Sequence, residues 1–120
     1  MNSSFAIAVR KDPQGRFAVV ITDGYINNLG GEKIGEAAHR LIAEGYTRII
    51  INLEKSTVIN SIGISVLIEI IEKMEETHGR LAFCHLTRTI QKTFTMMGLV
   101  QYASVFETEN DAVLGVLADA

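Results

Sequence analysis

The sequence predicts an α/β fold: a mainly parallel sheet with an N-terminal antiparallel hairpin strand and about four helices. Two short, almost continuous apolar runs, residues 48–53 and 80–86, are typical of strands that are buried on both faces. Amphipathic segments of helical period alternate with these runs, and a repeated β-α order implies parallel strands joined by right-handed crossovers. At 120 residues, the chain is expected to form a single domain, residues 1–120.

The N-terminal hairpin is predicted from two β-prone runs, residues 5–10 and 16–22. The segment between them, Asp12-Pro-Gln-Gly15, has proline in second place and glycine in fourth place, which favours a type I turn. We therefore expect antiparallel pairing, with the first strand near an edge of the sheet.

The first helix is predicted over residues 32–44, with its apolar positions within 34–42, after a loop at 23–31 that is dense in turn residues. Gly45 is expected to end this helix, and Gly79 to end the next one. The remaining predicted elements are a helix over 89–97 ended by Gly98, a strand at 104–107, and a terminal helix capped by Asn110.

Charge and composition exclude several function classes. The net charge is −3 and no run of Lys or Arg occurs, so we expect no direct binding to nucleic acid. The lone Cys84 lies in an apolar run, which indicates a buried small hydrophobe in a reducing compartment. Because Glu69 and Glu72 interrupt the longest apolar segment, we expect no membrane span, and no signal peptide is recognised. The protein is expected to be cytoplasmic.

The inventory of catalytic residues is thin. His39, His78 and His85 are scattered, without the spacing of metal ligands, and we expect structural roles for all three. No phosphate-binding glycine loop and no nucleophile elbow is present. We therefore predict a protein that is not an enzyme and that uses no metal and no cofactor.

The most informative stretch is residues 57–74, a loop that leads into an amphipathic helix. Asn60 and Ser61 stand where the N-cap belongs, and capping alone explains either residue. The alternative is functional: a phosphate on Ser61 would be stabilised by the unpaired N–H groups and the dipole of the helix start. The residues alone leave both interpretations open.

The same helix carries an apolar arc that is wider than a surface helix normally buries. Its centre faces the sheet, and Ile62, Val66 and Ile70 extend it to one side. Two explanations fit this pattern: contact with a neighbouring helix in the core, or a surface on which a partner docks.

With these residues in view, the chain resembles the STAS domain of anti-sigma-factor antagonists over about residues 5–118. In that family, the turn after the central strand reads apolar-Asp-Ser-Ser/Thr-Gly-Leu/Ile. The matching segments here are Ile49–Leu53, Val58-Ile-Asn-Ser-Ile-Gly-Ile64, Gly79-Arg-Leu-Ala-Phe83, Phe94-Thr-Met-Met-Gly-Leu99, Val105-Phe106 and Asn110-Asp-Ala112.

The resemblance implies a STAS-like fold and a regulatory switch. Ser61 falls on the family's phosphoacceptor, which is modified by an ATPase-type serine kinase that is also the anti-sigma factor. The unphosphorylated form would bind this kinase and thereby regulate sigma-dependent transcription. The residues expected to bind the partner are Asn27, Asn60, Ile62, Gly63, Val66 and Ile70.

Three departures from the family pattern leave an alternative open. Asn60 and Asn27 stand where the family has aspartates, and Ile62 replaces the second hydroxyl of the turn. The chain could therefore be a non-phosphorylated STAS subunit that acts as an assembly module of a larger signalling complex.

Overall fold

The computed structural model describes residues 4–118, which form one five-stranded sheet in the order β1-β2-β3-β4-β5. β1 pairs antiparallel with β2, and every other neighbouring pair is parallel, which confirms the predicted class. The strands are β1 (Ala6–Lys11), β2 (Ala18–Asp23), β3 (Arg48–Lys55), β4 (Arg80–Cys84) and β5 (Ser104–Phe106). The helices are α1 (Asn28–Ala43), α2 (Ser61–Glu76), α3 (Arg88–Met96), the 3₁₀ turn η1 (Leu99–Gln101) and α4 (Glu109–Leu117).

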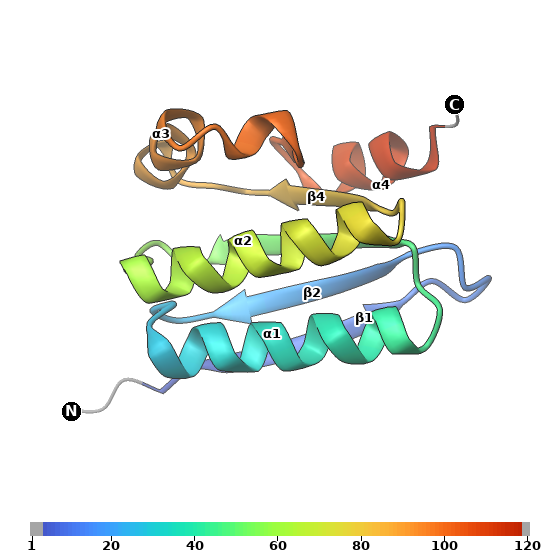
Figure 1. Ribbon diagram of the computed structural model, residues 1–120, viewed down its shortest axis with the longest axis horizontal. Coiled ribbons are helices and arrows are strands. Elements are labelled where there is room, and N and C mark those ends of the chain that lie inside the picture. Colours follow the sequence, from blue (N-terminus) through green and yellow to red (C-terminus); the bar gives the residue numbers. More distant parts are fainter. Residues whose placement is uncertain (1–3, 119–120) are drawn as a thin grey trace.

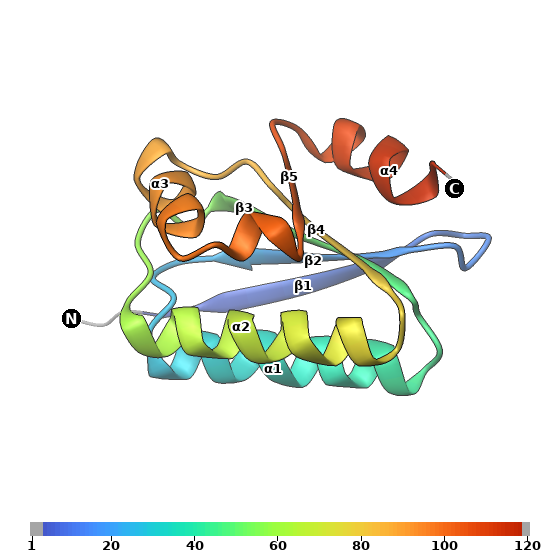
Figure 2. The same cartoon turned by 45° about the horizontal axis from the view of Figure 1, so that its top comes forward.

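The helices form a layer on each face of the sheet. α1 and α2 lie side by side on one face and begin at the same end of the molecule, whereas α4 packs on the opposite face over β3 and β4 (Figures 1 and 2). β3 is buried on both faces, as its apolar run predicts: Ile49 and Ile51 belong to the core under α1 and α2, and Ile50 to the smaller core under α4.

The N-terminal hairpin has the predicted turn and position. The backbone N–H of Gly15 donates to the carbonyl of Asp12 at 2.8 Å, which closes the turn. Asp12 also accepts hydrogen bonds from the backbone N–H and the guanidinium of Arg16. β1 lies at the edge of the sheet, as predicted.

α1 begins earlier than its apolar pattern predicts, inside the stretch that was expected to be a loop. Its N-cap is Asn27, and its first turns include the buried Gly30 and Gly31. Glycine disfavours a helix by conformational entropy, but here it lets α1 approach α2 closely: a Cβ on Gly31 would lie 3.1 Å from a methyl carbon of Val66. The other end follows the prediction, because Gly45 has φ of 99° directly after the C-cap.

Two other helix boundaries differ from the prediction. After α2, the left-handed residue is His78, with φ of 58°, while Gly79 is needed because a Cβ there would lie 2.8 Å from the carbonyl oxygen of Thr47. α4 is capped by Thr108, whose Oγ1 accepts from the N–H of Asp111 at 3.1 Å, so Asn110 lies within the first turn. The left-handed Gly98, with φ of 74°, follows α3 as predicted.

Cys84 is buried and free at the end of β4, as expected for a small hydrophobe. Desolvation is the largest influence on this thiol and raises its pKa to about 12, so the reactive thiolate is strongly disfavoured. Within residues 4–118, no helix has both the length and the hydropathy that crossing a membrane requires.

Glu109 ties the start of α4 to the sheet. Its carboxylate accepts from the Asn52 amide at 3.0 Å and from the Arg10 guanidinium at 2.7 Å, and its backbone N–H donates to Nε2 of His85 at 3.3 Å. Desolvation is the largest influence on the carboxyl and raises its pKa, but the bonds from Asn52 and Arg10 outweigh it, so the pKa lies below its ordinary value.

Replacing Glu109 with glutamine is expected to flatten the dependence of stability on acid pH. Because the folded state lowers the pKa of Glu109, the carboxylate stabilises the fold above its ordinary pKa of 4.5, and this stabilisation is lost as pH falls through the folded value. Urea unfolding of the wild type and Glu109→Gln at a series of pH values checks this. A stability difference between the two proteins that stays constant from pH 6 to pH 3 would contradict it.

Candidate functional site at the start of helix α2

The starts of α1 and α2 are built in the same way and are tied to each other. Oδ1 of Asn27 accepts from the N–H of Gly30 at 3.1 Å, and Oδ1 of Asn60 accepts from the N–H of Gly63 at 2.8 Å. Ile26 lies between the two starts: its N–H donates to Val58 and its carbonyl accepts from Asn60, each at 3.0 Å. Two of the predicted site residues, Asn27 and Asn60, are therefore the caps of adjacent helices.

Gly63 is buried in the first turn of α2 because the loop before α1 crosses directly over it. A Cβ at this position would lie 2.5 Å from the carbonyl oxygen of Ile26 and 2.9 Å from a side-chain carbon of Ile59. Any larger residue would push this loop away from the helix. Gly63 therefore allows the close contact between this loop and α2, and it has no side chain with which to bind a partner.

Ser61 is the first residue of α2 and is exposed. Because Asn60 makes the cap bond, Ser61 is not the N-cap, and its hydroxyl has no hydrogen-bond partner among residues 4–118. The backbone N–H groups of Ser61 and Ile62 find no acceptor in the described part of the chain, and no acidic residue lies in the first turn of α2. An anion attached to Ser61 would meet two free N–H donors and the positive end of the helix dipole.

Exposed apolar side chains lie near this serine in the sequence and near the start of the neighbouring helix α1. Ile62 follows it at 47% exposure, and Val58 lies in the loop before it at 54%. Tyr25 and Leu29, on either side of the Asn27 cap, are also exposed. These four exposed residues lie on or next to the two helix starts that Ile26 links, and we call them the Ser61 rim.

The predicted docking edge along α2 is shorter than the sequence suggests. Val66 is half-buried, and Ile70 is fully buried at 0% exposure in the core that α1 and α2 share with the sheet. The assignment of Ile70 to the partner-binding surface is therefore wrong for direct contact, because the close approach of α1 covers that part of the arc. Ile62 and Val66 remain at the surface.

A shallow groove of about 420 Å³ runs between α1 and α2 from this rim. Its floor is apolar and comprises Ile62, Val66 and the two glycines of α1, Gly31 and Gly35. The remaining lining residues are polar or charged: Asn28, Glu32, Glu36, His39 and Glu69. The site thus combines an exposed hydroxyl, an apolar floor and an acidic border.

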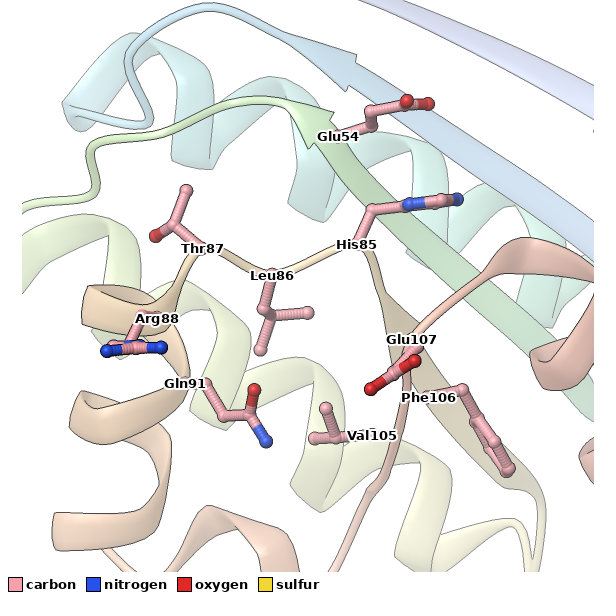
Figure 3. A pocket seen from close by; sticks show the side chains of 9 residues that line it. All are labelled: Glu54, His85, Leu86, Thr87, Arg88, Gln91, Val105, Phe106 and Glu107. Atoms are coloured by element: carbon pink, nitrogen blue, oxygen red, sulfur yellow. The ribbon is translucent and has the colours of Figure 1, made fainter.

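A second cavity, of about 530 Å³, was not predicted from the sequence and opens beyond the carboxyl ends of β4 and β5 (Figure 3). It is lined by Glu54, His85, Leu86, Thr87, Arg88, Gln91, Val105, Phe106 and Glu107. His85 was expected within a strand, but it follows β4 with φ of 59° and accepts a hydrogen bond at the start of α4, which is the structural role expected for it. Within the described residues, no three His, Cys, Asp or Glu side chains are grouped so as to hold a metal ion.

Replacing Asn60 with alanine is expected to destabilise the protein by about 1 kcal/mol, because the N–H of Gly63 loses its acceptor. Asn60→Asp should retain the stability, since aspartate caps equally well and its charge complements the helix dipole. Urea unfolding of the three proteins measures both differences. Equal stability of Asn60→Ala and wild type would show that the cap bond contributes nothing.

Comparison with known proteins places this geometry in a family. The model of the STAS domain matches residues 8–112. A candidate anti-sigma factor antagonist of Bordetella bronchiseptica, BtrV, is 21% identical over 92 residues, which are 77% of this chain and 77% of that protein.

Solved structures share the fold. An anti-sigma factor antagonist from Mycobacterium paratuberculosis superimposes with a TM-score of 0.83 at 19% identity and covers 96% of each chain. The phosphorylated form of SpoIIAA, a cell fate determinant of Bacillus, has a TM-score of 0.74 at 23% identity, over 92% of this chain and 99% of that one. These TM-scores establish a common fold, and the family model matches most of the sequence. The chain belongs to the STAS domain family.

Proposed function

We propose that this protein is an anti-sigma-factor antagonist that acts in the cytoplasm by binding and not by catalysis. Its partner would be an anti-sigma factor that is also an ATPase-type serine kinase, and binding would free a sigma factor to direct transcription. The observation that carries the proposal is the exposed, unbonded hydroxyl of Ser61 beside the exposed Ile62. The family membership and the names of the relatives above support the same role.

Phosphorylation of Ser61 would act as the release signal. A partner that covers Ile62 and Val58 must also take Ser61 out of water, and a phosphate there would carry nearly two negative charges into that contact. Burying such a group without a matching cation costs more than the apolar contacts return. In the free protein, the N–H groups of Ser61 and Ile62 and the helix dipole would stabilise the same phosphate. The modification would therefore weaken the complex and leave the fold intact.

The two asparagines are compatible with this role. Asn60 and Asn27 make the cap bonds that an aspartate would also make, so the helix starts keep their geometry. They bring no negative charge near Ser61, which removes a repulsion that a phosphate would otherwise meet. We infer that the substitutions adjust the charge around the phosphoacceptor and do not disable it.

A capture experiment tests the proposal. Wild type, Ser61→Asp and Ser61→Ala would be used as baits in a lysate of the native host, and the bound proteins would be identified by mass spectrometry. We expect wild type and Ser61→Ala to retrieve a protein with a serine-kinase-type ATPase domain, and Ser61→Asp to lose it.

The same experiment distinguishes the phosphoswitch from the alternative function, a non-phosphorylated assembly module. Under the assembly-module hypothesis, all three baits would retrieve the same proteins, and Val66→Glu, which places a charge in the groove floor, would lose them. Retrieval of the same set by wild type and Ser61→Asp would therefore reject the switch and favour a constitutive subunit.

A further inference from the structure

A second exposed apolar surface lies away from the Ser61 rim, on α3 and η1. Met96 is 79% exposed and Tyr102 is 58% exposed, and Met97 and Val100 are also largely open to solvent. These four residues fall within seven consecutive positions, whereas single exposed hydrophobics elsewhere, such as Leu114, stand alone. Contiguous exposed apolar residues tend to mark sites of interaction.

A groove of about 450 Å³ runs along this surface, between α2 and the segment from α3 to η1; we call it the α2–α3 groove. Its lining residues are Ile68, Ile71, Glu72, Glu75, Met97, Leu99 and Tyr102. Ile71 lies ten residues after Ser61, which is about 15 Å along the helix axis. None of the residues of the Ser61 rim lines this groove.

The charge along the groove has one sign. α2 carries four glutamates and one lysine, and Lys73 is already paired with Glu76 at 3.7 Å. Glu72 and Glu75, which line the groove, have no ion-pair partner in the part of the chain that the structure describes. Lys92 of α3 lies one turn before Met96 and does not line the groove, so the charged residues of the lining are the two glutamates of α2.

We propose that the α2–α3 groove binds a basic amphipathic helix of a partner protein. Two or three apolar anchors at helical spacing would occupy the floor between Ile71 and Met97, and Lys or Arg on one flank would pair with Glu72 and Glu75. Methionine suits such a floor because its unbranched, polarisable side chain adapts to differently shaped anchors.

A second copy of this chain fits the groove poorly. The chain carries a net charge of −3, and a symmetric contact through this face would bring the carboxylates of two α2 helices toward each other. A basic segment meets the opposite situation, since the two carboxylates that line the groove, Glu72 and Glu75, attract it. The charge therefore selects the partner's chemistry, and the apolar floor supplies the contact area.

The probe is a synthetic 14-residue helix of leucine and lysine, with leucine on one face and lysine on the other, titrated into ¹⁵N-labelled protein. We expect chemical-shift changes that centre on Ile68, Ile71, Met97 and Tyr102. Reversing both charges, Glu72→Lys with Glu75→Lys, should weaken binding about tenfold, as expected for losing two exposed ion pairs and gaining repulsion. A peptide with glutamate in place of lysine should not bind.

Matched variants distinguish binding of the peptide at this groove from its general attraction to an acidic protein. Glu32→Lys with Glu36→Lys makes the same charge change on α1 and should leave the affinity within about twofold of wild type. Met97→Ser should weaken binding, whereas Leu114→Ser, an exposed apolar change on α4, should not. Ser61→Glu should also leave the affinity unchanged, so this test is independent of the phosphoswitch.

Three results would overturn the proposal. Equal weakening by the α1 and α2 charge reversals would show non-specific attraction. Shifts that centre on Ile62 and Val66 would place the peptide in the groove between α1 and α2. A concentration-dependent dimer that Met97→Ser dissociates would show that a second copy occupies the surface.

Discussion

Gly63→Ala is expected to destabilise the protein by about 3 kcal/mol, a large share of the stability of a domain of this size. The added Cβ would lie 2.5 Å from the carbonyl oxygen of Ile26 and 2.8 Å from its Cγ2. That carbonyl accepts the N–H of Asn60, so the loop cannot move away without breaking the link between the two helix starts. The strain is thus greater than the usual gain in helix propensity from glycine to alanine.

Gly35→Ala is the matched control for this variant. Gly35 is also a buried helical glycine, but its Cβ would meet only a methyl group of Val66, at 3.3 Å, which side-chain rotation can relieve. We expect its stability to stay within about 1 kcal/mol of wild type. Urea unfolding, monitored by circular dichroism, measures the stability of both variants. If Gly63→Ala were as stable as Gly35→Ala, the crossing loop would not constrain the site.

Ser61→Glu is expected to weaken binding of the captured kinase partner by about 100-fold, the order of cost for burying one unpaired charge in an interface. The fold should be unaffected, because a carboxylate in the first turn of α2 complements the helix dipole and Asn60 keeps the cap. Isothermal titration gives the affinity, and thermal unfolding confirms that the variant is folded.

Ser104→Glu provides the control for charge alone. Ser104 is exposed at the start of β5, the edge strand next to β4, and receives the same substitution. We expect its affinity for the partner to equal that of wild type. A loss with Ser104→Glu as large as the loss with Ser61→Glu would attribute the effect to overall charge.

The sequence predicts those features of the fold that local chemistry determines. The turn at Asp12–Gly15, the left-handed glycines Gly45 and Gly98, and the doubly buried β3 depend on one or two residues and their neighbours. The resemblance of the turn around Ser61 to the STAS pattern likewise depends on adjacent residues, and it identified the family that the comparison shows.

The sequence does not predict the features that depend on packing between elements distant in the chain. Gly30 and Gly31 indicate a loop by propensity, yet they lie in α1. Gly31 leaves room for Val66 of α2, and Gly30 leaves room for Phe5 and the carbonyl of Tyr25. Ile70 is fully buried, although the helical projection had left both core contact and a docking surface open for it. The cavity around His85 combines β3, β4 and β5 with the start of α3, so no single stretch of sequence could signal it.

The phosphoswitch at Ser61 is tested most directly by phosphorylation in vitro. The captured partner would be incubated with ATP and either wild type or Ser61→Ala, and the modified residue would be located by mass spectrometry. Our account predicts one phosphate on Ser61 of the wild type, none on Ser61→Ala, and release of the partner from the phosphorylated chain only. A wild type that stays unmodified, or one modified at Ser61 that still binds the partner fully, would contradict it.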